Sequence, residues 1–399
     1  MRRVKKKVAR IEKNPIKKGD LLKLLIGIFG FAMGGVLISL VFLLPEEVLA
    51  ELDFPELPTK TEDAGIYSDL TGLVVASSEE KTAPAYCIQT PNGTDGARPQ
   101  AGLDQAGVVF EAIAESGITR FAAIYQNPSA AVIGPIRSLR LYYLQWDTPF
   151  DCAIVHAGGA DDAIEAVRSG NYKDVSENYY YMYRGTYGVR RWNNLFTNAT
   201  DLAAVNNDWG FGSSNIKGFK RMTPEQAHKN RVKMSSGNMV ITEPTEGDTS
   251  KMTASATNIA INFGNWPNFN VRYSYDSGSN TYARSYESGA AHEVYSCPAE
   301  NLGEVNPEDH CALKQLAPSV VVAMIVDERR AEDNYHEDIT TVGSGEAYIF
   351  QNGYAVHGTW NKSSVGSQLK FYDESGAEIS LVPGQTFVEA VPSYGSIEY

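Results

Sequence analysis

Three consecutive stretches decide the fold of the N-terminal part of this chain: ARPQAGLDQAGVVFEAIAESGITRFAAIYQ (97–126), IGPIRSLRLYYLQWDTPF (133–150) and DCAIVHAGG (151–159). The first contains two apolar runs, 108–114 and 118–126, separated only by Glu-Ser-Gly. Short apolar runs joined by a glycine-containing turn are typical of neighbouring strands. This stretch therefore predicts a pair of strands.

The next two stretches predict an alternation of helix and strand. In residues 136–146, Leu139, Tyr142, Tyr143 and Trp146 recur at the spacing of an amphipathic helix. The run 151–156 is apolar and ends at a Gly-Gly pair, as a buried strand would. We expect further helices at 161–170, where acidic residues open the first turn and Gly170 ends the last, at 200–209, and at 223–231, where Thr-Pro-Glu supplies an N-cap.

After residue 245 the pattern changes to short strand-like runs. They are TNIAINF, NVRYSYD, TYARSYE, SVVVAMIVD, EAYIFQ, YAVHGTW, LKFYD, AEISL and TFVEAVP, several of them joined by turn signals such as DSGSN and QNG. The fold class that we predict is α+β: a mixed α/β N-terminal domain, then a smaller, mostly antiparallel β domain, with one transmembrane helix before both.

With 399 residues, the chain is longer than a usual single domain. The predicted organisation is a basic cytoplasmic tail (1–23), a transmembrane helix (24–44), a flexible acidic stalk rich in Pro, Ser and Thr (45–83), an α/β domain (84–245) and a β domain (246–399).

The charge is distributed unevenly between the tail and the rest of the chain. The formal net charge is -13. Residues 1–23 contain ten Lys and Arg against two acidic residues, a net charge of +8, so the remainder carries -21. A body this acidic repels phosphate backbones, and we expect no nucleic-acid partner.

The segment Leu24–Leu44 is the expected membrane anchor. Its 21 residues contain no charge, enough for a helix to cross a hydrocarbon core of about 30 Å. Positive residues precede it, so the tail is expected in the cytoplasm and the body outside. The alternative is a cleaved signal peptide, since Val48-Leu49-Ala50 resembles a cleavage site, but the apolar run is longer than a signal peptide needs.

The four cysteines fall into two groups. Cys297 and Cys311 border a polar loop, and in an exported protein such a loop favours a disulfide over a zinc site. Cys87 and Cys152 lie in apolar runs and are interpreted as buried thiols.

The candidate ligand site is a set of cations between predicted strands. Its members are Arg98, Arg120, Arg137, Ser138, Arg140, His156, Gly158 and Gly159. Guanidinium groups bind phosphate and carboxylate with two hydrogen bonds, and backbone N–H groups at a Gly-Gly turn before a helix add donors. The alternative is that the arginines form structural ion pairs with acidic residues nearby in the sequence: Glu111, Glu115, Asp147 and Asp151.

His156 is a candidate for a catalytic residue, as a general base or hydrogen-bond donor at a strand end, although a lone histidine there is more often a buried structural residue. Ser138 lacks the GxSxG context of a nucleophile. Asp161 and Asp162 fit the first turn of a helix without a metal, so we predict no metal site. The absence of the familiar nucleotide, zinc and calcium motifs predicts no cofactor.

The stretch NYYYMYRGTYGVRRWNNLF (178–196) is dense in Tyr, Trp and Arg, the residue types favoured at recognition surfaces. It predicts either a groove for a sugar or peptide, or packing between the two domains.

The chain resembles the YerB-like family of bacterial envelope lipoproteins. The resemblance rests on ARPQAGL (97–103), 111–126, IGPIRSLR (133–140) and VHAGG (155–159), and in the second half on TVGSGEAYIFQNGYAVHGTW (341–360) and FYDESGAEISLVPGQTFVEAVP (371–392). It implies an N-terminal α/β domain and a C-terminal β domain, and it implies no reaction. No cysteine follows the apolar segment at a lipidation position, so a protein helix would replace the lipid.

Two functional hypotheses follow. The first is a membrane-anchored, extracytoplasmic, non-catalytic module that binds a cell-wall polymer, its anionic precursor or an envelope protein. The second is an envelope enzyme that acts on a phosphorylated or glycan substrate, with Arg120, Arg137 and Arg140 holding the anion and His156 or an acidic neighbour moving a proton.

Overall fold

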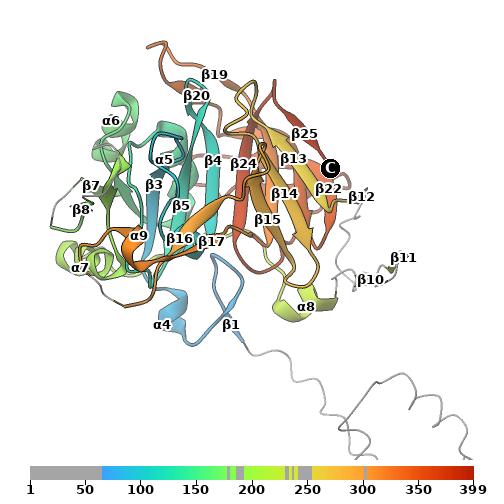
Figure 1. Cartoon of the computed structure of the whole chain (residues 1–399), viewed down its shortest axis with the longest axis horizontal. Helices are drawn as coiled ribbons and strands as arrows, with labels where there is room; N and C mark the ends of the chain where they lie inside the picture. The colour runs from blue at the N-terminus through green and yellow to red at the C-terminus, as the bar shows by residue number, and fades with distance from the viewer. Residues whose placement is uncertain are drawn as a thin grey trace, which may run out of the picture. The chain divides into compact units, whose positions relative to one another are not determined.

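The structure, a computed structural model, describes residues 65–177, 180–185, 193–229, 233–235, 238–240, 254–300 and 303–399. Residues 65–399 form one compact unit (Figure 1). The expected tail, the anchor 24–44 and the first part of the stalk lie outside the described residues. In the part of the chain that the structure describes, no helix combines the length and the apolar character needed to cross a membrane.

Eleven strands of the described residues form one large mixed sheet. Its order is β12-β22-β21-β18-β24-β4-β5-β3-β6-β7, with β23 also paired to β22. The strands are β3 Ala85–Pro91, β4 Val108–Glu115, β5 Ile118–Gln126, β6 Ala153–His156, β7 Lys173–Ser176, β12 Ala254–Ser255, β18 Val320–Val326, β21 Gly343–Gln351, β22 Tyr354–Lys362, β23 Lys370–Asp373 and β24 Thr386–Pro392.

Helices and short strands cover the two faces of this sheet. The helical segments are α4 Ser78–Lys81, η1 Leu103–Gln105, α5 Leu141–Asp147, η2 Thr148–Phe150, α6 Asp161–Ser169, α7 Ala199–Trp209, α8 Pro224–Lys229 and α9 Pro307–His310. A second sheet has the order β15-β14-β13-β25, with β13 Asn258–Asn262, β14 Val271–Asp276, β15 Thr281–Tyr286 and β25 Ser396–Glu398. Two-stranded pairs are β1 Ile66–Tyr67 with β2 Val74–Val75, β8 Tyr183–Arg184 with β9 Leu195–Phe196, β10 Lys233–Ser235 with β11 Asn238–Val240, β16 Glu293–Ser296 with β17 Ala312–Gln315, and β19 Glu328–Arg330 with β20 Glu337–Ile339.

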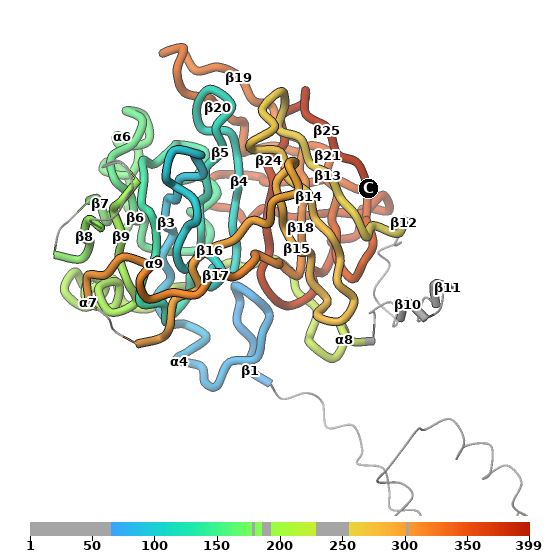
Figure 2. The backbone as a smooth tube through the Cα atoms, in the orientation of Figure 1, coloured from blue at the N-terminus to red at the C-terminus, as the bar shows by residue number. Residues whose placement is uncertain are grey.

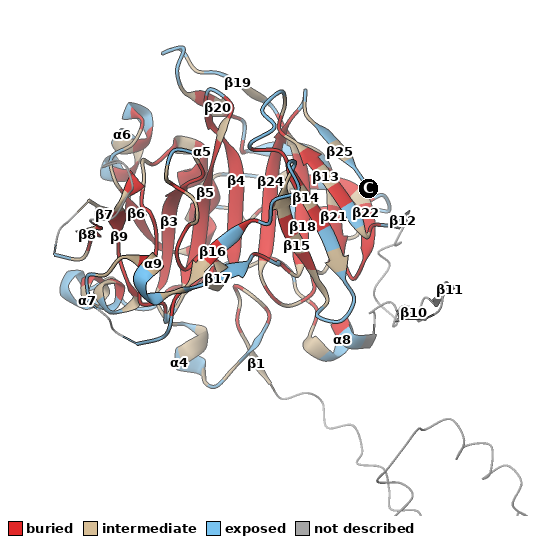
Figure 3. Ribbon diagram, viewed as in Figure 1, coloured by how far each residue is buried: buried red, intermediate tan, exposed pale blue. Residues whose placement is uncertain are grey.

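The central strands are buried on both faces, which Figure 3 shows as a red centre. One hydrophobic core covers one face and includes residues of α5, α6 and α8. Two cores share the other face: one under α7 and β16–β17, and one under the sheet β13–β15. A strand that is buried on both faces has a continuous apolar run in the sequence. Such a run locates the strand but does not show which of its side chains point into which core.

Most elements expected from the sequence are present. The expected strand pair is β4–β5, joined at Ser116 and Gly117, whose φ values of 49° and 78° are both positive, as a type I′ turn requires. The helices expected at 161–170, 200–209 and 223–231 are α6, α7 and α8.

The helix expected over 136–146 begins only at Leu141. Residues before it are extended because their backbone groups bond to other segments: the Arg137 N–H donates to Gln89 O at 2.7 Å and the Leu139 N–H donates to Gly158 O at 2.9 Å. The run 377–381 is likewise no strand in the structure. Tertiary hydrogen bonds therefore override the local helical pattern in the arginine-rich segment.

The large sheet takes strands from both halves of the sequence. β24, near the C-terminus, lies parallel between β18 and β4, so Thr386 is paired with Val320 on one side and Val108 on the other. The other described strand pairs within the C-terminal half are antiparallel, as expected, and β18–β24 is the parallel exception. A single sheet continues across the boundary predicted at residue 245; the boundary itself remains a prediction.

The strand pair β16–β17 of the C-terminal half, which we call the arm, makes a second connection to the N-terminal half. Figure 2 shows β16 and β17, in orange, crossing in front of the N-terminal strands. The Gly102 N–H donates to Tyr295 O at 2.8 Å and the Tyr295 N–H donates to Gln100 O at 2.7 Å. Val294, Cys297 and Leu316 of the arm pack into the core on that face.

Both pairs of cysteines form disulfides. Cys297 and Cys311 are bonded, with 4.4 Å between their Cα atoms, as the sequence predicts. Cys87 and Cys152 are also bonded, with Cα atoms 5.7 Å apart, so the interpretation of these two as buried thiols is wrong. Their runs are apolar because β3 and β6 are adjacent parallel strands, and that adjacency brings the two sulfurs together.

Removal of the Cys87–Cys152 disulfide is expected to destabilise the protein. The bond closes a loop of 65 residues, and constraint of the unfolded chain by a loop of this length corresponds to about 4 kcal/mol. We expect the Cys87→Ala/Cys152→Ala chain to lose free energy of unfolding of this order in urea titrations. The Cys297→Ala/Cys311→Ala chain, whose loop has 14 residues, should lose less, about 3 kcal/mol. Equal stability of the Cys87/Cys152 variant and the parent chain would contradict the prediction.

Candidate functional site

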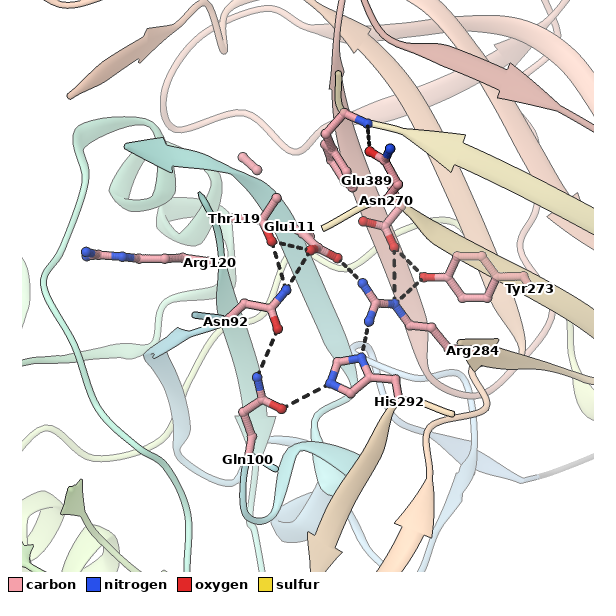
Figure 4. A network of polar contacts seen from close by, with 12 residues as sticks. Asn92, Gln100, Glu111, Thr119, Arg120, Asn270, Tyr273, Arg284, His292 and Glu389 are labelled. Carbon is pink, nitrogen blue, oxygen red and sulfur yellow. Dashed lines mark hydrogen bonds and ion pairs between the residues drawn. The ribbon is translucent and has the colours of Figure 1, made fainter. Parts of the chain in front are cut away.

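The most extensive polar cluster described here is a closed ring of hydrogen bonds in the middle of the sheet (Figure 4). Arg284 donates to Glu111 Oε2 and to Nδ1 of His292. His292 Nε2 then donates to Gln100 Oε1 at 3.0 Å, Gln100 Nε2 donates to Asn92 Oδ1 at 3.2 Å, and Asn92 Nδ2 donates back to Glu111 Oε1 at 3.0 Å. All five side chains are fully buried.

Glu389 and Tyr273 extend this ring toward the second sheet. The Tyr273 hydroxyl donates to Glu389 Oε1, and Arg284 Nε lies 3.8 Å from the same oxygen. Glu389 and Glu111 are paired in register on adjacent strands. Burial, and then the charge of Glu111, raise the pKa of Glu389 well above its usual range.

The rest of the ring has one well-defined charge state. Burial opposes the charge on Arg284, but Glu111 and Tyr273 outweigh it and raise its pKa. Burial and the neighbouring Arg284 lower the pKa of His292 well below its usual value, so His292 is neutral and accepts at Nδ1. This buried network joins the two sequence halves, and of its polar side-chain atoms Glu389 Oε2 lacks a hydrogen-bond partner. Its burial favours a structural role.

Sequence reasoning did not identify this ring, although a signal is present. Each of two central strands has a glutamate in the middle of a mainly apolar run, Glu111 in VVFEAIA and Glu389 in TFVEAVP. A charge in a strand buried on both faces needs a buried partner. What the sequence could not supply is that these two strands are neighbours.

Replacement of Arg284 by Met leaves Glu111 charged and unpaired in the core. We expect the free energy of unfolding to fall by ~3–5 kcal/mol in urea titrations of the full chain. Arg329→Met, at a side chain that is 78% exposed, is the matched control and should change stability by less than about 1 kcal/mol. The triple variant Arg284→Met/Glu111→Gln/Glu389→Gln should recover part of the loss, because no buried charge remains. An Arg284→Met chain as stable as the control would contradict a structural role of the ring.

Arg98 belongs to the surroundings of this ring and not to the other predicted arginines. Its Nε donates to Asn92 Oδ1 at 2.8 Å, and its guanidinium lies 4.0 Å from the centre of the Tyr286 ring and 5.1 Å from that of Phe269. Burial lowers its pKa, and its Nη2 atom is buried without a hydrogen-bond partner. The predicted set of four arginines is therefore divided.

The other three arginines meet around one carboxylate at the end of β4. Glu115 ends β4, and the type I′ turn brings Arg120 of β5 back beside it. Arg120 pairs with Glu115 Oε1, and Arg140 Nη2 lies 2.7 Å from Glu115 Oε2. Burial opposes the ionisation of Glu115, but the two arginines hold its pKa below the usual value. The alternative of structural ion pairs thus describes Arg120 and Arg140.

Arg137 makes the cluster positively charged. It lies in the extended segment before α5, where its charge interacts with Glu115 and Arg140, and burial is the main cause of its lowered pKa. Its side chain is half-buried, and its Nε atom has no hydrogen-bond partner. Glu115 pairs with Arg120 and Arg140, while Arg137 interacts with the charges of Glu115 and Asp95. The arginine cluster, defined as Glu115, Arg120, Arg137 and Arg140, therefore has an excess of positive charge.

A cleft of about 700 Å³ lies next to this cluster, between Arg140 and the β19–β20 hairpin. The hairpin projects beyond one end of the sheet (Figure 1), and His336 in it forms a backbone bridge to Glu115. The lining of the cleft carries two arginines and six acidic side chains: Arg140, Arg329, Asp161, Asp162, Glu332, Asp333, Glu337 and Asp338. Arg140 lies on one wall and Arg329 on the hairpin, and carboxylates line both sides.

The remaining predicted residues lie beside the segment that carries Arg137 and Arg140. Leu139 and Gly159 form a parallel bridge, so Gly158 and Gly159 lie beside the arginine segment, and Ser138 accepts from Arg120 through its carbonyl oxygen at 3.0 Å. His156 is buried: Nδ1 lies 2.8 Å from Gly158 O and Nε2 lies 2.8 Å from Asp174 Oδ1. Among the residues described, no group of three His, Cys, Asp or Glu is placed to hold a metal ion.

The aromatic stretch 178–196 lies in part outside the described residues. Of its described members, Tyr183 is buried under α7, and its hydroxyl donates to Val305 O at 2.9 Å. Tyr180 is exposed. The predicted groove and the predicted packing role of the stretch both remain predictions.

Glu328, at the base of the hairpin, is poised to titrate near neutral pH. Burial raises its pKa to about 7, although Tyr394 donates to its Oε1 at 2.9 Å. The usual pKa of a glutamate is 4.5. Between pH 4.5 and about 7, the folded protein therefore holds a proton on Glu328 that the unfolded chain has released. This group therefore lowers stability as the pH rises from about 4.5 to about 7.

We expect Glu328→Gln to remove that contribution. The difference in melting temperature between the variant and the parent should grow in favour of the variant as the pH rises from 5 to 7.5 and then level off. Glu332→Gln, at an exposed glutamate of the same hairpin, is the control. A difference that stays constant across this pH range would show that Glu328 ionises as it does in water.

Comparison with known proteins identifies the family. Residues 70–212 match the N-terminal domain, and residues 259–388 the C-terminal domain, of the family described as "Protein of unknown function (DUF3048)". The chain is 25% identical over 327 residues to the "Putative lipoprotein YerB" of Bacillus subtilis (strain 168), a match that covers 81% of this chain and 85% of the relative. The crystal structure of the YerB protein from Bacillus subtilis superimposes with a TM-score of 0.64 at 21% identity, over 84% of this chain and all of that one. The chain belongs to the YerB-like family, as the resemblance of its sequence motifs implies.

Proposed function

We propose that this protein is a membrane-anchored, extracytoplasmic binding module whose arginine cluster holds an anionic group of a cell-envelope polymer or of its precursor. The apolar segment 24–44 and the name of the YerB relative support an anchor at the membrane. Two disulfides favour an oxidising compartment.

The observation that carries the proposal is the charge imbalance of the cluster. Arg120 and Arg140 are 4% and 3% exposed and share the one carboxylate of Glu115, while Arg137 adds a third positive charge with an unpaired Nε atom. Largely desolvated cations are stable only when paired, so an added anion stabilises this group more than it would stabilise exposed arginines. Of the three, Arg137 is the most accessible and is the residue that meets the ligand.

The acidic lining of the neighbouring cleft restricts which anion can bind. Six carboxylates on the cleft lining repel a ligand that is densely charged along its length. A polymer or lipid-linked precursor with one or few phosphate or carboxylate groups places its anion at Arg137 and keeps its neutral part in the cleft.

The enzyme hypothesis is not favoured by the position of its proposed base. Both ring nitrogens of His156 lie 2.8 Å from protein acceptors, and the residue is 1% exposed. Neither nitrogen is free to take a proton from a substrate.

The test uses the full-length protein in detergent micelles and farnesyl phosphate as the probe, with farnesol as its uncharged control. Arg137→Ala should weaken binding of farnesyl phosphate at least tenfold, equivalent to about 1.4 kcal/mol, because the accessible cation is lost. Arg137→Lys should retain part of the affinity, because lysine keeps the positive charge but lacks the planar guanidinium that donates two hydrogen bonds to one anion. Arg168→Ala, which removes an exposed positive charge from the last turn of α6, should have no effect.

Isothermal titration at two salt concentrations measures these affinities. Binding should weaken as salt rises, because it depends on charge. No binding of farnesyl phosphate by the parent protein, equal binding of farnesol, or unchanged affinity in Arg137→Ala would each reject the proposed anion site.

A further inference from the structure

We infer that a second surface, formed by Trp266 and Tyr394 beside an amide-lined hollow, binds the pyranose rings of a neutral glycan. This surface lies on the C-terminal half of the chain, and the inference does not depend on the anion site. We call it the aromatic platform and define it as Trp266, Tyr394, Asn262, Asn265, Asn270 and Glu287.

The two aromatic side chains are exposed although each rests on a glycine. Trp266 is 48% exposed and Tyr394 is 62% exposed. A Cβ atom added to Gly117 would lie 2.1 to 2.2 Å from three atoms of the five-membered ring of Trp266, Nε1, Cδ1 and Cε2. Nearly equal distances to three ring atoms mean that the flat face of the indole covers Gly117, and about half of the residue stays exposed.

Tyr394 lies next to this indole. A Cβ atom added to Gly264 would lie 3.0 Å from Tyr394 Cε2 and 3.9 Å from Trp266 Cδ1, which places both rings around the same glycine. The Tyr394 hydroxyl donates to Glu328 Oε1 at 2.9 Å, and this bond fixes the orientation of the ring. Glycines under both rings let the rings lie close to the backbone in positions that a larger residue would obstruct.

The backbone that carries Trp266 is also held in place. The N–H groups of Phe269 and Asn270 both donate to Trp266 O, at 2.9 and 3.3 Å, and Phe269 is buried beneath. A ring with a fixed backbone loses little conformational freedom when it binds a ligand, which favours affinity.

A hollow of about 450 Å³ beside the rings is lined by uncharged polar groups and one carboxylate. Asn270 Nδ2 donates to Glu287 Oε2 at 2.8 Å, and Asn262 Nδ2 donates to Ser396 Oγ at 2.8 Å, so these groups hold one another in fixed positions. Asn265 is exposed at the edge of the hollow. Fixed amides and a carboxylate next to an apolar surface are the groups that orient a polar ligand.

Exposed aromatic rings beside fixed amides and a carboxylate fit a sugar better than other ligands. One face of a pyranose ring presents C–H groups that pack on an aromatic face, while its hydroxyls bond to amide and carboxylate groups. Glu287 is partly neutralised by Arg272 at 3.3 Å, so the hollow attracts neither strong cations nor anions. Two adjacent rings suit a chain of at least two sugar units.

The position of the platform relates it to the arginine cluster. Gly117, under Trp266, lies two residues after Glu115 in the β4–β5 turn. The platform and the cluster thus lie at the same end of the sheet.

The test measures binding of chitotetraose and of cellotetraose to the full-length protein in micelles, by titration calorimetry and tryptophan fluorescence. Trp266→Ala should weaken binding at least tenfold, because the stacking surface is lost. Asn265→Ala should weaken it by a smaller factor while leaving both rings in place. Trp209→Ala, at an exposed tryptophan of α7, is the matched control and should bind as the parent does.

Further variants separate this site from folding and from the anion site. Tyr394→Phe keeps the ring and loses the bond to Glu328, and it should bind more tightly than Tyr394→Ala. Arg137→Ala should bind both neutral sugars normally, even if it no longer binds farnesyl phosphate. If neither sugar binds at millimolar concentration, or if Trp266→Ala binds as well as Trp209→Ala, the platform is not a glycan site.

Discussion

The ion pair of Arg284 with Glu111 is the interaction on which the two halves of this protein depend. Both side chains are completely buried, and they come from opposite halves of the sequence. A buried charge without its partner is strongly destabilising, so each half supplies the partner that the buried charge of the other half needs. The ring through His292, Gln100 and Asn92 satisfies the remaining polar atoms and fixes the geometry.

The sheet is built around this pair. On the face of β4 that carries Glu111, Val109 packs into one core and Ile113 into another, and on β24 the residues Phe387 and Val391 repeat this arrangement around Glu389. The polar ring therefore separates two hydrophobic cores on one face, while a single core covers the other face. The parallel insertion of β24 between β18 and β4 makes the two domains of the family into one continuous sheet.

The two candidate sites lie at the end of this sheet and differ in chemistry. The arginine cluster offers positive charge held close to water by Arg137, and the aromatic platform offers two flat rings and fixed amides. Both depend on the β4–β5 turn, which carries Glu115 on one side and supports Trp266 at Gly117 on the other. The rigidity of β4, buried along its whole length, positions both sites.

The sequence by itself determined the family, most strands and helices, the Cys297–Cys311 disulfide and the segment that holds Arg120, Arg137 and Arg140. These follow from local signals: periodicity, turns, caps and short motifs. Only the tertiary structure decided that Arg98 joins a different cluster, that Cys87 meets Cys152, that the extended segment 136–140 replaces a helix, and that Glu111 faces Arg284. Each of these depends on which strands are neighbours. A chain with strands buried on both faces does not encode that order in any local pattern, because its apolar runs are nearly interchangeable.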